Sequence, residues 1–448
     1  MNLHTRNILD RAFSGTGVLA IALMTAALLL LLVPLFLRGS AALVFQGTVE
    51  HRRFLLEKFE RGNREEVEAE IRAARAAQEP VWRWLKDFEQ HLSAGDAAAR
   101  TRYRKPVKEL RQAIHFLLGP EPGKAPPLLM RDQYGQTRME LAQRGLERVL
   151  WREEWDYSDP ARGGVRDLKS RAADFAGTPL EPLFPYVERN AESMLLPRRT
   201  VYWGFLTDES FDSHFFGGIW PEILGTLYLT LGTLLLAVPM GLIAAIYLTE
   251  YARETRFLAF LRTCINTLAG VPSIVFGLFG LAFFINTARV SPSKSVLAGS
   301  MTLALMILPT VIRASEEAIK AVPRTFKEAA LSLGAGRWRT VCSVILPAAL
   351  PGVLTGIVIS MGRAAGETAP IIFTAAVSVG KPLALWQTLT QPTPALSWNI
   401  YNLATEHEAV DLVRHVQYGL VLTLVCLVLV LNLLAIVLRA RIARKMRS

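Results

Sequence analysis

The sequence predicts an all-α membrane protein in which six transmembrane helices carry a large polar domain between the first and the second. Hydrophobic residues make up 51% of the chain, and they gather in long stretches instead of spreading evenly. Six stretches meet or approach the roughly 20 apolar residues that a helix needs to cross a bilayer. The predicted spans are residues 12–37, 223–249, 263–288, 295–312, 340–362 with a continuation past Arg363, and 416–438.

The first span follows two arginines, which is also typical of a secretory signal. Its apolar part is too long for a typical signal sequence, so we expect an uncleaved anchor helix. The expected order is an N-terminal cytoplasmic segment and anchor (1–38), an extracytoplasmic helical domain (39–217), a transmembrane domain (218–440) with a cytoplasmic loop (314–347), and a basic cytoplasmic tail (441–448).

The net charge of +11 could indicate a nucleic-acid partner, so its location decides what it means. Residues 38–215 hold 29 Lys and Arg against 28 Asp and Glu, so the excess lies in the membrane-associated part. Basic residues collect in alternate loops and in the C-terminal tail, which places both termini in the cytoplasm. We therefore expect the lipid bilayer, and no nucleic acid, as the partner of this charge.

The polar domain shows apolar residues at helical spacing along 54–92, 107–118 and 139–155, which predicts a mainly helical fold. Its histidines are scattered without the spacing of metal ligands, so no metal site is expected. A packing domain and a sensory or partner-binding domain both remain open.

The loop at 314–347 has helix-forming composition on either side of Pro323, and Gly334 follows. Two short helices, 314–321 and 324–333, are expected there. Small Ala329 and Ala330 allow close approach of another surface, and Glu328 offers a charge to a partner.

The loop has the order Glu328-Ala329-Ala330, Gly334 and Leu346-Pro347. This spacing resembles the EAA loop of ABC importer permeases, with Val344 where the family has isoleucine. The resemblance implies a type I permease core whose loop docks on a separate ATPase subunit. The alternative is an amphipathic loop lying on the membrane surface.

Two further strings narrow the resemblance. Residues 269–279 (AGVPSIVFGLF) and 366–370 (GETAP) are similar to the membrane permeases of the Pst phosphate importer, and the second string is similar to its A subunit in a long form with an extracytoplasmic insert. The resemblance covers residues 220–440. It implies inorganic phosphate as the transported substrate, with a C-type permease, an ATPase dimer and an extracytoplasmic phosphate-binding protein as partners.

The chain contains no GxxxxGK[ST] phosphate-binding loop and no G-x-S-x-G, HExxH or CxxC motif. We therefore expect no enzyme activity, no catalytic residue, no metal and no cofactor in this chain. ATP and magnesium would bind to the partner ATPase.

Charged residues inside predicted spans are costly, at roughly 2.5 to 3.5 kcal/mol each. Arg363 is expected near mid-membrane, with Glu367 four residues later on the same helix face. The pair could be an internal ion pair that lowers its own insertion cost, or Arg363 could line the path and bind phosphate oxygens while Glu367 holds it between passages. Arg313 ends the fourth predicted span, where snorkelling to the surface is the ordinary explanation. The resemblance implies a transport role for it.

Gly270, Pro272 and Gly277 in the third span, and Pro370 after the fifth, weaken helices in stretches that would line a path. Such breaks are also ordinary packing devices.

The resulting prediction is a multi-pass permease of the bacterial cytoplasmic (inner) membrane that imports phosphate. A permease for sulfate or molybdate is the nearest alternative, and a membrane sensor with an extracytoplasmic ligand-binding domain is a more distant one.

Overall fold

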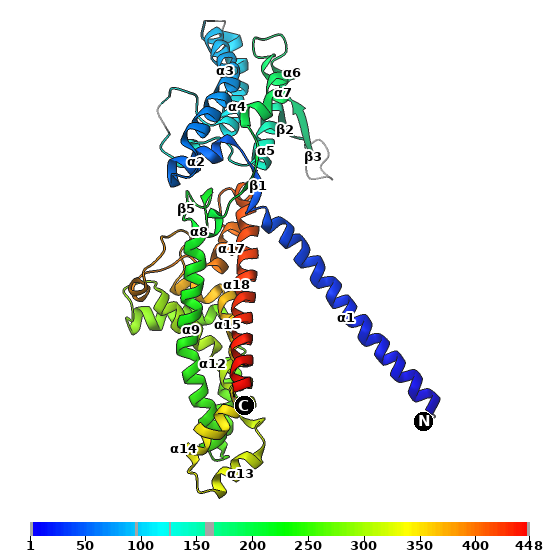
Figure 1. Ribbon diagram of the computed structural model, residues 1–448. Coiled ribbons are helices and arrows are strands. Elements are labelled where there is room, and N and C mark those ends of the chain that lie inside the picture. Colours follow the sequence, from blue (N-terminus) through cyan, green and yellow to red (C-terminus); the bar gives the residue numbers. More distant parts are fainter. Residues whose placement is uncertain (1–2, 95–96, 125–126, 157–164, 446–448) are drawn as a thin grey trace. The chain divides into compact units, whose positions relative to one another are not determined.

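The computed structural model describes residues 3–94, 97–124, 127–156 and 165–445. The chain packs as two compact units (Figure 1). One consists of Leu43–Tyr202, and the other of Met1–Ala42 together with Trp203–Ser448. The first unit, called the insert below, is narrower than the expected domain at 39–217. The second is called the membrane unit.

The insert is mainly helical. Its elements are β1 (Val44–Gly47), α2 (Val49–Phe59), α3 (Arg64–Ala94), α4 (Ala97–Leu118), the 3-10 turn η1 (Met130–Asp132), α5 (Met139–Leu150), β2 (Trp151–Asp156), β3 (Val165–Ser170), α6 (Arg171–Asp174), α7 (Leu183–Leu195) and β4 (Arg198–Val201). Amphipathic α3 buries one face at a spacing of three to four residues, from Val67 to Phe88. Large apolar side chains such as Leu85, Leu110 and Phe175 form its core.

One expected helix in the insert is too long. The stretch 139–155 was predicted as helical throughout, but α5 ends at Leu150 and residues 151–156 pair antiparallel with β3. The segment Trp151 to Trp155 has an aromatic at each end of three charged residues, and strand pairing with a later segment overrides its local helical composition.

The two ends of the insert are joined by a short sheet. Strands β1 and β4 pair antiparallel, with Val44 opposite Val201, and the Tyr202 amide donates to the Leu43 carbonyl at 2.8 Å. The chain therefore enters and leaves the insert at neighbouring points, as is common for inserted domains.

The membrane unit consists of α1 (Leu3–Ser40), α8 (Gly204–Thr207), β5 (Ser210–Phe211), β6 (Phe216–Gly217), α9 (Trp220–Ile246), the π-helix η3 (Tyr247–Tyr251), α10 (Arg256–Leu268), α11 (Ser273–Gly280), the π-helix η4 (Leu281–Thr287), α12 (Val296–Lys320), α13 (Arg324–Ser332), α14 (Arg337–Thr340), the π-helix η5 (Val341–Ile345), α15 (Leu346–Gly366), α16 (Ala369–Thr374), the 3-10 turn η6 (Leu385–Leu389), α17 (Leu396–Thr405) and α18 (Val410–Lys445).

Helix α12 is central to this unit and packs against both α9 and α15, while α15 also packs against α18; Figure 1 shows these helices side by side. Small residues allow the close approach. A Cβ added to Gly356 of α15 would lie 2.3 Å from the Cβ of Ala314 on α12. Threonines in α9 bond to their own helix backbone, as Thr233 does to the Leu229 carbonyl, so their hydroxyls need no other partner.

Five helices among the described residues are long and apolar enough to cross a membrane, or six if one bent pair forms a single span. That pair is the predicted third span. Residues 256–268 and 273–287 form two helical segments bent by 98°, so this span is not one straight helix. Pro272, which lacks an amide donor, has an extended backbone directly before α11, and the bend lies at Gly270 to Pro272.

A second correction concerns the cytoplasmic loop. The expected short helix at 314–321 is the last part of α12, which runs without interruption from Val296 to Lys320. Arg313 thus lies inside a long helix, seven residues before its last residue, Lys320. Only α13 is separate, as predicted, and it follows Pro323.

A buried polar cluster holds the start of α9. Glu222 is fully buried, and its Oε1 lies 2.9 Å from Nε2 of His214 and accepts from Nδ2 of Asn399 at 3.1 Å. His214 reaches this position from a turn in which Asp212, Ser213 and His214 all have positive φ, a conformation that is costly for residues other than glycine.

Candidate functional site

Helix α13 carries the loop motif on an exposed surface. None of its residues, which include Glu328, Ala329 and Ala330, is buried. Gly334 follows the helix with φ of 81°, and the Ala335 amide donates to the Ala330 carbonyl, which closes the helix end in the manner of a Schellman motif. The glycine of the motif is therefore required by backbone geometry.

Apolar side chains on this segment face outward. Leu333 is 89% exposed and Trp338 is 68% exposed, and Phe326 and Leu331 are exposed as well. Exposed apolar groups at this density mark an interaction surface. Leu346 and Pro347, the end of the motif, begin α15 after η5.

An ion pair holds α13 against the membrane unit. Lys327 donates from Nζ to Oε2 of Glu250, which lies in η3 at the end of α9. The Glu250 side chain is mostly buried, so this contact ties the motif helix to the adjacent span. Sequence reasoning missed this pair because its members are far apart in the chain.

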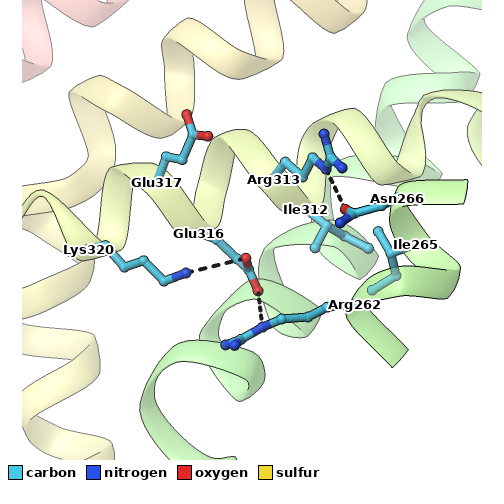
Figure 2. A pocket seen from close by; sticks show the side chains of 8 residues that line it. All are labelled: Arg262, Ile265, Asn266, Ile312, Arg313, Glu316, Glu317 and Lys320. Atoms are coloured by element: carbon cyan, nitrogen blue, oxygen red, sulfur yellow. Dashed lines mark hydrogen bonds and ion pairs between the residues drawn. The ribbon is translucent and has the colours of Figure 1, made fainter. Parts of the chain in front are cut away.

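A charged pocket lies between α10 and α12, with a volume of about 230 Å³. Figure 2 shows its lining side chains, three of which are cations: Arg262, Arg313 and Lys320. Arg313 had been predicted, whereas Arg262 and Lys320 were considered only as cytoplasmic basic residues. The bend after α10 is what brings α10 against this part of α12.

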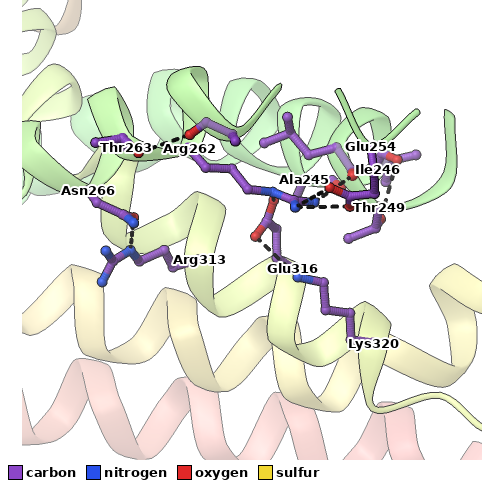
Figure 3. A network of polar contacts seen from close by, with 12 residues as sticks. Ala245, Ile246, Thr249, Glu254, Arg262, Thr263, Asn266, Arg313, Glu316 and Lys320 are labelled. Atoms are coloured by element: carbon purple, nitrogen blue, oxygen red, sulfur yellow. Dashed lines mark hydrogen bonds and ion pairs between the residues drawn. The ribbon is translucent and has the colours of Figure 1, made fainter. Parts of the chain in front are cut away.

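Arg262 and Lys320 are engaged with carboxylates. Arg262 donates from Nη1 to Glu254 at 3.1 Å and from Nη2 to the Leu248 carbonyl at 3.2 Å, and its Nε lies 4.0 Å from Glu316. Lys320 lies 3.6 Å from the same glutamate. Figure 3 shows this network, which joins the end of α9 to α10 and α12.

Arg313 has a different partner. Its Nε donates to Oδ1 of Asn266 at 2.7 Å, and among the described residues this is its one side-chain hydrogen bond. Both residues are exposed. Sequence reasoning did not select Asn266, and its one signal was a carboxamide within a predicted apolar span.

The second predicted pair forms as an ion pair. Nε of Arg363 donates to Oε1 of Glu367 at 3.2 Å, with the side chains 40% and 20% exposed. Glu367 is the C-cap residue of α15, directly after Gly366, and its backbone is extended. Arg313 lies on α12 and Arg363 on α15, and each has its own partner, Asn266 and Glu367.

The remaining predicted residues are helix breaks, and two of them meet. A Cβ on Gly277 would lie 2.9 Å from the Ala369 carbonyl and 3.0 Å from the Cα of Pro370, so this glycine allows α11 and α16 to touch. Gly270 and Pro272 form the bend described above. A role of any of them in a path stays a prediction, as do the roles of the motif residues.

Comparison with known proteins gives a consistent set of relatives. Residues 237–448 match the family described as binding-protein-dependent transport system inner membrane component. The probable ABC transporter permease protein YqgI of Bacillus subtilis is 33% identical over 275 residues, which cover 59% of this chain and 90% of that protein.

Two phosphate transport system permease proteins are also similar. PstA 1 of Mycobacterium tuberculosis (strain H37Rv) is 34% identical over 56% of this chain and 78% of its own length. PstA of Yersinia pestis is 36% identical over 50% of this chain and 73% of its own length. Among solved structures, an inward-facing MetNI methionine ABC transporter matches 51% of this chain and 94% of its own, at 17% identity and a TM-score of 0.37.

Proposed function

The chain belongs to the family of inner membrane components of binding-protein-dependent transport systems, the permeases of ABC transporters, and from this premise we propose that it is the A-type permease of an ATP-driven phosphate importer. Family and apolar helices together make it a multi-pass inner membrane protein. Phosphate as the substrate is supported by the similarity to the PstA proteins and by two arginines, Arg313 and Arg363, on packed helices.

The observation that carries the proposal is α13. This short helix has no buried residue, carries exposed apolar side chains and is closed by Gly334. Such a helix fits into a groove of a partner, and the partner here is the ATPase dimer. ATP and magnesium bind in that dimer, and this chain supplies no cofactor.

Motion of α13 passes into the permease through two connections. Lys327 pairs with Glu250 at the end of α9, and α12 continues as one helix past Arg313 to Lys320, from which three residues lead to the start of α13 at Arg324. A displacement of α13 by the ATPase therefore acts directly on two packed spans, and packed spans shift as units. This alternates access to the path.

Arg313 and Arg363 supply the anion contacts along the path. A guanidinium offers paired N–H donors that match phosphate oxygens. Glu367 bonds to Arg363 through Nε, so it orients the side chain and replaces the anion between passages. The helix breaks at Gly270, Pro272 and Pro370 give the polar backbone groups that a water-filled path can satisfy.

The complete importer pairs this chain with a C-type permease, two ATPase copies and an extracytoplasmic phosphate-binding protein. Both permeases have the type I arrangement, with termini in the cytoplasm. The insert then lies on the outer side, together with the binding protein. A permease for sulfate or molybdate has the same architecture, so only a transport measurement with each anion distinguishes the substrates.

The test is ATP-dependent uptake of labelled phosphate by the complete importer in proteoliposomes. Wild type takes up phosphate, and neither sulfate nor molybdate in excess competes. Leu333→Asp loses the ATPase during purification, because a carboxylate replaces an apolar contact. Arg363→Gln assembles normally but lowers uptake more than tenfold.

Arg414→Gln is the matched control, since Arg414 forms an exposed ion pair with Asp411 away from the pocket, and it keeps wild-type uptake. Wild-type uptake by Arg363→Gln would contradict the path, and competition by sulfate or molybdate would change the substrate.

A further inference from the structure

We propose that Asn266 is a positioning residue that orients the guanidinium of Arg313 toward the transported anion without forming an ion pair with it. The inference rests on the proposed function, in which Arg313 contacts phosphate. It gives Asn266, which the sequence did not indicate as a site residue, an effect on the affinity for the anion.

The geometry of the contact determines the orientation. Asn266 lies on α10, one turn before the bend, and Arg313 lies in the last third of α12. The hydrogen bond from Nε of Arg313 to Oδ1 of Asn266 is 2.7 Å long. Since a guanidinium is rigid and planar, binding Nε to one acceptor restricts the directions in which the other two nitrogens can point. Nη1 and Nη2 then remain as donors for an anion, and Figure 2 shows them pointing away from Asn266.

The hydrogen bond to Asn266 preorganises the Arg313 side chain for anion binding. A free arginine side chain carries about 2 kcal/mol of rotamer entropy, part of which must be lost whenever it binds a ligand. The contact to Asn266 removes some of that freedom beforehand. The carboxamide nitrogen of Asn266 is a further donor at the same place, and it makes no hydrogen bond within the part of the chain that the structure describes.

The acceptor that holds Arg313 is a neutral carboxamide, whereas the other cations of the pocket face carboxylates. Arg262 and Lys320 line the same pocket, but both face Glu316, and Arg262 also binds Glu254. Their charge is already compensated. Arg313 is held by a neutral carboxamide and forms no ion pair within the described part of the chain, although the carboxylate of Glu317 also lines the pocket. Its guanidinium therefore keeps more of its attraction for an anion than Arg262 or Lys320 does. A carboxylate in the place of Asn266 would compete with the anion for the guanidinium.

Neighbouring contacts keep α10 in place for this task. Arg262, one turn earlier on α10, binds the Leu248 carbonyl and reaches Glu316 on α12 (Figure 3). Asn266 is therefore presented from an anchored helix, and its substitution leaves that anchor intact.

The test compares Asn266→Ala and Asn266→Asp in the complete importer, with phosphate uptake measured over a range of concentrations. Asn266→Ala is expected to raise KM about fivefold with little change in maximal rate, because the guanidinium loses its orientation. Asn266→Asp is expected to lower kcat/KM more than tenfold, because an ion pair then holds Arg313. Thr267→Ala is the control, since Thr267 is exposed on the same helix and its hydroxyl donates to the Thr263 carbonyl of that helix.

A double variant separates positioning from a general structural effect. Arg313→Lys has no Nε–H, so adding Asn266→Ala to it should change KM less than twofold. An equal effect of Asn266→Ala in both backgrounds would overturn the inference, as would wild-type kinetics of both Asn266 variants.

Arg313→Gln, measured alongside, separates this failure from failure of the proposed function. Wild-type uptake by Arg313→Gln overturns the path itself. Loss of uptake there, together with unchanged Asn266 variants, overturns only the positioning role.

Discussion

The insert and the membrane unit differ in the side chains that form their packed interior and in how each accommodates a buried charged residue. The insert packs large apolar side chains and buries Arg138 against the ring of Phe45, at 3.6 Å from the ring centroid. The membrane unit brings helix backbones together through small residues, and it buries Glu222 with two hydrogen-bond partners. The two regions should therefore fail under different perturbations, with added volume harming the membrane unit and added protons harming the insert.

The largest effect is expected from one added methyl group between α12 and α15. In Gly356→Ala the new Cβ would lie 2.3 Å from that of Ala314, so the helices must separate, at a cost of up to about 3 kcal/mol. The melting temperature of the purified permease should fall. Gly362→Ala on the same helix is the control, because its Cβ would meet Val428 at an ordinary 3.6 Å.

Adding Ala314→Gly to Gly356→Ala should recover much of the loss, since it removes the other methyl group. If Gly356→Ala and Gly362→Ala melted at the same temperature, the close approach of the helix backbones would not limit the stability of the membrane unit.

The next effect concerns pH and is confined to the insert. Burial, together with the charges of Arg138 and Arg52, lowers the pKa of His51 from its ordinary 6.5 to about 3. The unfolded insert then binds a proton below pH 6.5 that the folded insert refuses until about pH 3. Stability is thus fully present above pH 6.5 and is lost as the pH falls, by about 2 kcal/mol at pH 5.

Hydrogen exchange of α2 to α7 in the full chain, measured in urea between pH 7.5 and 5, checks this slope. His51→Gln should remove most of it, and His115, whose pKa burial also lowers, contributes in the same direction. A slope that persists unchanged in His51→Gln would assign the pH sensitivity to other groups.

The smallest effect is expected when the insert is removed altogether. Leu43 and Tyr202 are hydrogen-bonded neighbours, so a short Gly-Ser linker from Ala42 to Trp203 leaves the membrane unit's connections in place. The shortened permease should melt near the wild-type temperature and keep ATP-dependent phosphate uptake. Its failure to fold would show that the membrane unit depends on the insert, and the two regions could not then be compared as independent.

Hydropathy predicted most of the membrane unit because long apolar stretches leave few alternatives to a membrane helix. It did not predict the 98° bend, since a window of apolar residues ignores where the chain turns. The same reasoning separated residues 314–321 from the fourth span as a short helix, although α12 continues as one helix to Lys320.

At the site, residue spacing predicted contacts between residues that are near in sequence and missed contacts between distant ones. It predicted the exposed helix before Gly334 and the pair of Arg363 with Glu367, which are near in sequence. It could not find Asn266 beside Arg313, or Glu250 beside Lys327, because only the folding of separate segments brings those partners together.

The π-helix η5, which lies between the motif loop and α15, determines how α15 is rotated about its own axis. A π-helical turn holds one residue more than an α-helical turn, and one residue corresponds to a rotation of about 100° around the helix axis. Because η5 directly precedes α15, it determines the azimuth of every side chain that follows, Arg363 and Gly356 included. A deletion of one residue in Val341–Ile345 would turn the small-residue face away from α12 while leaving composition and hydropathy almost unchanged.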